Sequence, residues 1–181
     1  MKLLTRVPRI EVKRCFLISD DTKKHSLKEA KKKFLSMSEK KLDERIKKKS
    51  KKRLHDYNRL EWYIGVVNPH EVGVWRGAGG LPLSFTRESL KKTAMFVKSA
   101  LRDASPLLKE RAQTAIPGIM KNVTILGQKQ KYLFPIIVSG PTFRRRGMKK
   151  MLGDIDDGCM RSIVLALKGK KFIRAYIGVE V

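Results

Sequence analysis

The sequence predicts an α+β fold, in which a small mixed sheet with two or three helices follows a basic helical N-terminal arm. The charge distribution predicts the arm, because residues 23–53 hold fifteen Lys or Arg against four acids. The later part of the chain intersperses strand-like apolar runs with amphipathic helical segments, which predicts the α+β domain. We therefore expect a basic N-terminal extension over residues 1–58, helical and partly disordered, and a compact domain over residues 59–181.

The N-terminal segment is predicted to hold one strand followed by basic helices. Residues 9–18 (RIEVKRCFLI) are apolar enough for a strand, although their alternation is irregular. Ser26 and Glu29 form a capping-box pattern that starts a helix. Apolar residues then recur at helical spacing, at Leu27, Ala30, Phe34 and Met37. A second box at Ser36 and Glu39 predicts a break near residue 37, and the helix beyond it carries only a thin apolar stripe.

The domain after residue 59 is predicted element by element from apolar runs and turn residues. We expect strands over residues 60–67, 120–126, 131–140 and 171–181. The sequence GQKQ between the second and third of these strands indicates a hairpin. We expect helices over residues 86–101, between Ser105-Pro106 and Ile116-Pro117-Gly118, and over residues 159–168.

The net charge indicates an anionic partner. Forty-two Lys and Arg against seventeen Asp and Glu give +25, a self-repulsion that destabilises a compact chain until an anion neutralises it. Nucleic acid fits this requirement, because each neutralised phosphate releases a counterion and strengthens binding. We therefore expect nucleic-acid binding with a steep dependence on salt. Contacts from Lys and Arg to phosphate serve DNA and RNA alike, so DNA-binding and RNA-binding both stay open.

The cysteine content and the hydropathy of the sequence indicate the cellular compartment in which we expect the protein. The two cysteines, Cys15 and Cys159, form neither a disulfide framework nor a CxxC zinc site, which favours a reducing environment. No apolar run approaches the length of about 20 residues that spans a bilayer. We expect a soluble, intracellular protein that associates with nucleic acid and has no membrane partner.

Two cationic runs are candidate phosphate contacts. The first is the loop GPTFRRRGMKK (140–150), whose glycines leave it free to present guanidinium groups to phosphate oxygens. Its candidate residues are Arg144, Arg145, Arg146, Lys149 and Lys150. The second is the end of the basic segment, with candidates Lys47, Lys48, Lys49, Lys51, Lys52 and Arg53. Both runs would contact the backbone of a nucleic acid and read no sequence.

Acidic residues follow the first of these runs directly. In an extended segment Asp154 and Asp156 share a face, with Asp157 adjacent, so their carboxylates can converge on one cation. Hard oxygen ligands of this kind suit Mg²⁺, which would polarise a phosphate and activate a water. The alternative is structural, because acids before the helix at 159–168 also favourably cap its N-terminus. The sequence leaves metal binding and capping open.

Residues 60–181 resemble the RusA-type Holliday-junction resolvases, which are small, dimeric, Mg²⁺-dependent endonucleases of phages and bacteria. The segments that carry the resemblance occur in the family's order: LEWYIGVVNP, SFTRESLKKTAMFVKSAL, KYLFPIIVSGP, FRRR, DIDD and SIVLALKG. It implies metal-binding and catalytic roles for Asp154 and Asp156, and contacts to DNA from residues 144–146. Three departures stand against it: Asp157 replaces the family's Asn, Met160 stands where a lysine is expected, and Lys168-Gly169-Lys170-Lys171 replaces a later acidic pair.

Two functions therefore remain as hypotheses. The first is a Mg²⁺-dependent, structure-specific endonuclease. The second is a non-enzymatic viral nucleocapsid or coat protein, or a ribonucleoprotein component, which packages nucleic acid through its basic arm. Both hypotheses suit a phage- or virus-encoded protein that forms homo-oligomers. The apolar C-terminal strand suits an edge that pairs between subunits, and a central strand equally well.

Overall fold

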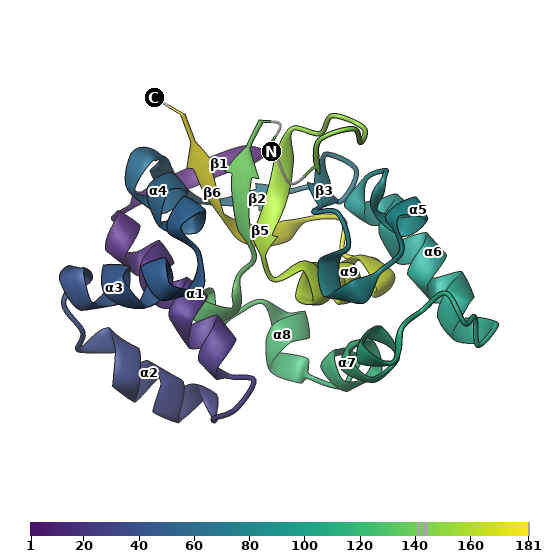
Figure 1. Cartoon of the computed structure of the whole chain (residues 1–181), viewed down its shortest axis with the longest axis horizontal. Coiled ribbons are helices and arrows are strands. Elements are labelled where there is room, and N and C mark those ends of the chain that lie inside the picture. Colours follow the sequence, from purple (N-terminus) through teal and green to yellow (C-terminus); the bar gives the residue numbers. More distant parts are fainter. Residues whose placement is uncertain (141, 143–144, 181) are drawn as a thin grey trace.

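The computed structural model describes residues 1–140, 142 and 145–180, and it confirms the predicted α+β class. About 51% of the chain is helical and about 18% is strand. The described residues hold nine α-helices around one six-stranded mixed sheet (Figure 1). The structure is therefore much more helical than a small sheet with two or three helices.

The sheet places the C-terminal strand at its centre. The strands are β1 (Lys2–Val7), β2 (Glu61–Val67), β3 (Val72–Val74), β4 (Ile136–Ser139), β5 (Gly153–Asp157) and β6 (Ile173–Val179). Their order is β1-β2-β6-β4-β5-β3, with parallel pairing between β4 and β6 and between β3 and β5. The other neighbours pair antiparallel. Of the two roles open to the C-terminal strand, the structure has the central one, and β1 and β3 form the edges.

The helices form two groups, one on each face of the sheet. The first group is α1 (Arg9–Asp21), α2 (Leu27–Leu35), α3 (Glu39–Lys49) and α4 (Lys51–Arg59). The second group is α5 (Leu83–Thr86), α6 (Leu90–Arg102), α7 (Glu110–Met120), α8 (Val123–Gly127) and α9 (Cys159–Leu167). Two short 3-10 turns, η1 (Ala78–Gly80) and η2 (Lys131–Leu133), complete the connections. Figure 1 shows the first group to the left of the sheet and the second to its right and below it.

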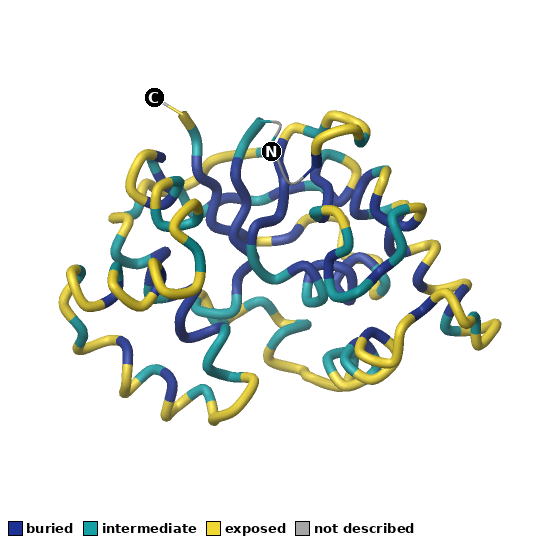
Figure 2. Tube along the Cα trace, viewed as in Figure 1, coloured by how far each residue is buried: buried dark blue, intermediate teal, exposed yellow. Residues whose placement is uncertain are grey.

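Alternation along the strands produces two separate cores. Ile136 and Val138 pack with α1 and with Tyr176, whereas Ile137 between them packs with Ile155 and the helices of the opposite face. This is the expected pattern when successive side chains of a strand point to opposite sides of a sheet that is covered on both faces. Figure 2 shows the buried residues along the strands and on the inward sides of the helices.

The basic N-terminal segment lies against the sheet and does not extend from it as an arm. β1 pairs with β2, and α1 buries Val12, Cys15 and Ile18 completely. Further along, Leu42 and Ile46 of α3 are also completely buried, in one core with Ile136 and Tyr176. The thin apolar stripe read from the sequence is therefore enough to attach this helix. The predicted boundary near residue 58 separates segments that share a core.

A buried lysine adds a polar attachment between two of the N-terminal helices. The side chain of Lys13 on α1 is fully buried, and its Nζ lies 2.7 Å from Glu39 and 2.6 Å from Asp43, both on α3. A buried ammonium is unfavourable unless carboxylates neutralise it. These ion pairs therefore hold α3 in a fixed orientation on α1.

Several local predictions are confirmed. Ser26 and Glu29 form the capping box at the start of α2. As expected, the helix is interrupted near residue 37, since α2 ends at Leu35 and α3 begins at Glu39. Helix α6 overlaps the helix predicted over residues 86–101, and it starts after Ser89, whose side chain accepts a hydrogen bond from the Lys92 N–H. The predicted helix over residues 159–168 is α9.

Three local predictions are wrong. Residues 9–18 lie in helix α1, because their irregular alternation fits helical spacing, in which the buried Val12 is followed by Cys15 and Phe16. Residues 120–126 lie in α7 and α8, where the Asn122 side chain caps α8, so the predicted hairpin does not form. Helix α7 begins at Glu110 and continues through Pro117.

We expect substitution Ile46→Ala to destabilise the whole protein by about 2–5 kcal/mol, the usual cost of a cavity at a fully buried aliphatic site. Urea denaturation followed by circular dichroism measures the effect. The matched control is Val123→Ala, because Val123 is 80% exposed and its truncation should change stability by about 0.5 kcal/mol or less. Equal stability of the two variants would mean that α3 is not part of the core.

Candidate functional site

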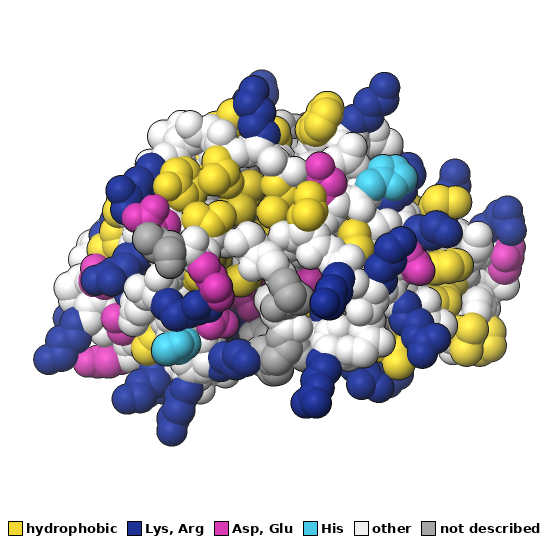
Figure 3. Space-filling view, turned by 90° about the horizontal axis from the view of Figure 1, so that it is seen from above, with side chains coloured by type: hydrophobic (Ala, Val, Ile, Leu, Met, Phe, Trp, Pro, Cys, Tyr) yellow, Lys and Arg dark blue, Asp and Glu magenta, His cyan; other side chains and the backbone are white. Residues whose placement is uncertain are grey.

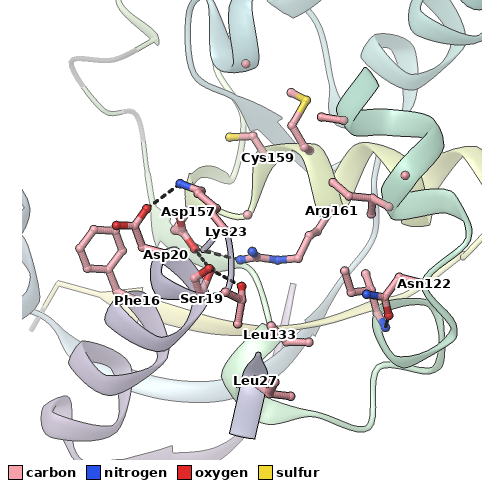
Figure 4. Close-up of a pocket in the computed structure, with 18 of the residues that line it drawn as sticks. Phe16, Ser19, Asp20, Lys23, Leu27, Asn122, Leu133, Asp157, Cys159 and Arg161 are labelled. Atoms are coloured by element: carbon pink, nitrogen blue, oxygen red, sulfur yellow. Dashed lines mark hydrogen bonds and ion pairs between the residues drawn. The ribbon is translucent and has the colours of Figure 1, made fainter. Parts of the chain in front are cut away.

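A cleft of about 1000 Å³ lies between the N-terminal helices and the α7–α8 region. One wall comes from α1, the start of α2 and residues Lys49 and Arg53. The opposite wall comes from α7 and α8, and the end of β5 with the start of α9 forms the floor. Figure 4 shows Ser19 of α1 and Arg161 of α9 converging on Asp157 at the floor.

The turn between β5 and α9 shapes the floor. Gly158 occupies it with φ of 83°, a left-handed conformation that glycine adopts without strain. A Cβ at this position would also lie 2.8 Å from the Arg161 guanidinium and 3.2 Å from the Pro135 Cα. The glycine therefore permits a sharp turn that brings Asp157 and Arg161 face to face.

Asp157 connects three elements at the floor. Its Oδ2 accepts a hydrogen bond from the Ser19 hydroxyl at 2.9 Å and lies 2.9 Å from the Arg161 guanidinium (Figure 4). Ser19 belongs to α1 and Arg161 to α9, so one carboxylate joins the helical groups of the two sheet faces. Ser19 is almost completely buried, which makes its hydrogen bond to the carboxylate important for stability.

Asp156 is held by a second set of partners. Its Oδ2 lies 2.6 Å from Arg53 Nε and accepts a hydrogen bond from the Tyr57 hydroxyl at 2.8 Å. The Arg53 guanidinium also stacks on the Phe16 ring, 4.3 Å from its centroid. Burial raises the pKa of Tyr57 well above 10, and the nearby Asp156 charge acts in the same direction. Tyr57 is therefore a neutral hydrogen-bond donor to the carboxylate.

Cations occupy both rims of the cleft. Asp20 pairs with Lys23 and with Lys49, each at 2.6 Å, on the N-terminal wall. Arg111 of α7 lies on the opposite wall. In all, five Lys or Arg and three Asp line the cleft, and each of the three carboxylates is paired with at least one of the cations. The cleft therefore has a positive balance with its acids neutralised.

Asp154 lies apart from this cleft and is paired with a buried arginine. Arg145 Nε lies 3.0 Å from its Oδ1, and the Thr142 N–H and hydroxyl donate to its Oδ2. The Arg145 guanidinium also donates hydrogen bonds to five backbone carbonyls, those of Val74, Thr86, Arg87, Glu88 and Lys149. A Cβ on residue 73 would overlap this guanidinium, so only glycine fits at this position without displacing Arg145.

Burial dominates the electrostatics of the Arg145–Asp154 pair. Desolvation raises the pKa of Asp154, and the Thr142 hydrogen bonds and the Arg145 charge only partly offset it. Desolvation also lowers the pKa of Arg145. Both groups are shifted toward their neutral forms, so their mutual attraction does not fully compensate for burial. The carbonyls around the guanidinium supply the remaining interactions.

The predicted phosphate contacts of the 140–150 loop have separate fates. Arg145 is buried and structural, which contradicts its predicted role, and Arg144 lies outside the described residues. Arg146 and Lys150 are exposed, and Lys149 is exposed with its Nζ 3.3 Å from Glu88. The face that carries this loop, seen from above in Figure 3, shows a cluster of hydrophobic side chains with Lys and Arg mainly around it.

The second predicted run lies beside the cleft. Lys47, Lys48, Lys51 and Lys52 are exposed around the junction of α3 and α4. Lys49 and Arg53 line the cleft itself, where Arg53 is committed to Asp156. Exposed cations therefore continue outward from the cleft rim, although the predicted contact from Arg53 is used inside the protein.

The predicted metal site is not assembled among the residues that the structure describes. Asp154 and Asp156 are both on β5, as the extended reading predicts, but each is paired with a different arginine. Within the described ranges no group of three or more His, Cys, Asp or Glu is placed to hold a metal ion. The N-cap position of α9 belongs to Gly158, so the alternative prediction of an aspartate cap is not met there either. Mg²⁺ binding stays a prediction.

Sequence reasoning missed several residues of the cleft. Ser19, Arg111 and Arg161 belong to segments without a motif, and Lys23 lies in the basic segment 23–53 but outside the two candidate cationic runs. Ser19 and Asp157 are 138 positions apart, and Arg53 and Asp156 are 103 apart. No local pattern signals such pairs. The one sequence feature that points to this cleft is the excess of Lys and Arg in the segment that forms α2–α4.

Comparisons with protein-family models, curated proteins and solved structures returned no match for this chain. The resemblance to the RusA-type resolvases therefore stays a prediction. Among the described helices, none has the length and apolar character that crossing a membrane requires.

We expect Arg145→Met to destabilise the protein by about 3–5 kcal/mol, because it leaves the Asp154 carboxylate buried without its cation. Urea denaturation at neutral pH measures this change. Arg146→Met is the control, since it removes the same side chain from the exposed neighbouring position and should change stability by about 0.5 kcal/mol or less. A similar small effect for both variants would show that the loop does not depend on Arg145.

Proposed function

We propose that this chain binds nucleic acid and that a single-stranded segment occupies the cleft. The observation that carries the proposal is the placement of cations on opposite walls: Lys23 and Lys49 on one and Arg111 on the other. Phosphate groups passing between these walls would be neutralised from both sides, with release of their counterions. The net charge of +25 supports the same partner.

The size of the cleft favours a single strand. A volume of about 1000 Å³ is at the upper end of the range for small-ligand sites, which suits a few nucleotides of one strand. The lining also offers aromatic surface from His25 and Trp75. Aromatic rings stack on unpaired bases of any sequence, so they complement cations that contact the backbone.

The carboxylates at the floor do not prevent this binding. Asp20, Asp156 and Asp157 each already have a cationic partner at 2.9 Å or less. Repulsion between these acids and an incoming phosphate is thereby reduced, while Arg111 on the far wall contributes a further positive charge. The resulting field attracts anions to the cleft entrance.

We expect the variant Lys23→Gln/Lys49→Gln/Arg111→Gln to bind a short single-stranded oligonucleotide more weakly and with a smaller salt dependence. If each cation contacts one phosphate, the slope of log K against log salt should fall by about 2, since single strands contribute about 0.7 per contact. Fluorescence anisotropy over a salt series measures both quantities.

The matched control is Lys168→Gln/Lys170→Gln/Lys171→Gln, which removes the same charge after the C-terminal end of α9, away from the cleft floor. Its slope should stay close to that of the unmodified protein. Equal losses in the two variants would mean that net charge alone drives binding. Absence of salt-sensitive binding in the unmodified protein would refute the proposal.

Mg²⁺-dependent cleavage is a second candidate function. The observation that favours it is the position of Asp156 and Asp157 at the floor of the cleft that we assign to phosphate. Carboxylates beside a bound phosphate are the ligands that Mg²⁺ uses in phosphate chemistry. A metal at Asp156 would have to displace the Arg53 guanidinium, which lies 2.6 Å away.

For this candidate we expect cutting of labelled branched DNA, single-stranded DNA or RNA with Mg²⁺, its loss with EDTA, and its loss in Asp156→Asn. The control Asp103→Asn alters an exposed carboxylate outside the cleft and should leave cutting unchanged. Thermal unfolding of both variants tests whether the fold is kept, because Asp156→Asn also removes the buried partner charge of Arg53. Tight binding without cutting would favour the non-enzymatic alternative, in which the chain packages nucleic acid.

A further inference from the structure

A second basic surface lies between α2 and α3, on residues that the cleft does not use. It is a groove of about 720 Å³ formed by the end of α2, the connecting turn and the outer side of α3. Four cations line it, namely Lys33, Lys41, Arg45 and Lys48. Glu44 is the acidic residue among its lining side chains. The groove therefore has an excess of three positive charges.

The spacing of three of these cations places them on one side of α3. Lys41, Arg45 and Lys48 follow one another at intervals of four and three residues, which is the repeat of a helical stripe. Over these seven residues the helix rises by about 10 Å. The stripe therefore offers an extended row of cations, as a polyanion requires.

The core fixes the direction of this stripe. Leu42 and Ile46 of the same helix are completely buried, so α3 cannot rotate about its axis without exposing them. Arg45 also lies over the Phe34 ring of α2, with its guanidinium carbon 5.8 Å from the centroid. This contact holds the arginine across the groove. The cations are thus held on a rigid scaffold, which lowers the entropy lost on binding.

Two further polar groups line the groove at the start of α3. Ser36 and Ser38 provide hydroxyl groups, and Ser38 is the N-cap residue whose side chain makes no capping hydrogen bond. Both residues are exposed and can donate to an anion. These hydroxyl groups supplement the four cations of the groove.

The groove and the cleft are adjacent in the chain. Lys48 lines the groove, and the next residue, Lys49, lines the cleft. Lys33 of the groove also pairs with Asp21, which neighbours the cleft residue Asp20. A strand that leaves the cleft over the end of α3 therefore meets the stripe directly.

We propose that the α2–α3 groove binds phosphates of the nucleic-acid backbone outside the cleft, so that one chain holds two consecutive stretches of the same strand. This inference rests on the proposed function for the identity of its ligand. It differs from that function in requiring cations that the cleft does not contain, and in depending on the length of the strand.

The experiment compares two oligonucleotides, one of about 4 and one of about 16 nucleotides, which cover the range of single-strand site sizes. We expect Lys41→Gln/Arg45→Gln/Lys48→Gln to lower the salt slope for the longer strand by about 2, at about 0.7 per phosphate contact. Its affinity and slope for the shorter strand should be unchanged. The variant Lys41→Gln/Lys48→Gln, which keeps Arg45 on Phe34, should lower the slope by about 1.4.

The control removes three charges elsewhere, at Lys168, Lys170 and Lys171, and should leave both slopes unchanged. Thermal midpoints equal to that of the unmodified protein show that the fold is retained. If the groove variants bind the longer strand with the original slope while the cleft variant loses the shorter one, the groove inference is wrong and the proposed function stands. If the unmodified protein binds neither strand, the proposed function fails, and the groove inference fails with it.

Discussion

The ion pair between Arg53 and Asp156 joins the Lys-rich helices to the sheet. Both side chains are largely buried, and removing such charges from water is unfavourable unless each finds a partner of opposite charge and further hydrogen bonds. Asp156 meets this condition through Tyr57, and the arginine through the Phe16 ring. Arg53 lies in the first turn of α4, close to the α3–α4 junction. Its contact with Asp156 therefore places the exposed lysines of that junction beside the cleft. A segment with the composition of an arm becomes one wall of a site.

The same residue types serve opposite purposes in this molecule. Arg145 and Asp154 look from the sequence like a phosphate ligand and a metal ligand, yet they are buried together and tie five carbonyls to the β3–β5 edge. Lys23 and Lys49, which belong to the basic segment 23–53, lie at the cleft rim. What separates the two uses is burial. A guanidinium surrounded by carbonyl groups has no capacity left for phosphate, whereas an exposed lysine loses little on changing partners.

The sequence predicts those features that depend on neighbouring residues. The α+β class, the capping box at Ser26, helices α6 and α9, and the extended conformation of Asp154 to Asp156 follow from local periodicity and hydrogen-bonding groups. The sequence predicts a strand where helix α1 lies, because charged residues such as Lys13 stand on the buried side of the helix and obscure its period. The partners of the aspartates could not be read at all, since Arg53 and Ser19 reach them only after the chain has folded. Predicting the ligands of a carboxylate requires knowing which charges are brought together in three dimensions.

The central place of β6 has a consequence for how this chain assembles as it is synthesised. β6 is the last of the six strands to be made, yet it alone joins the β1–β2 pair to the β4, β5 and β3 group. Until it emerges from the ribosome, β2 and β4 each present an unpaired edge, a state that favours pairing with other chains. The cationic helices between β1 and β2 are complete well before that moment. Their positive charge opposes such pairing between chains.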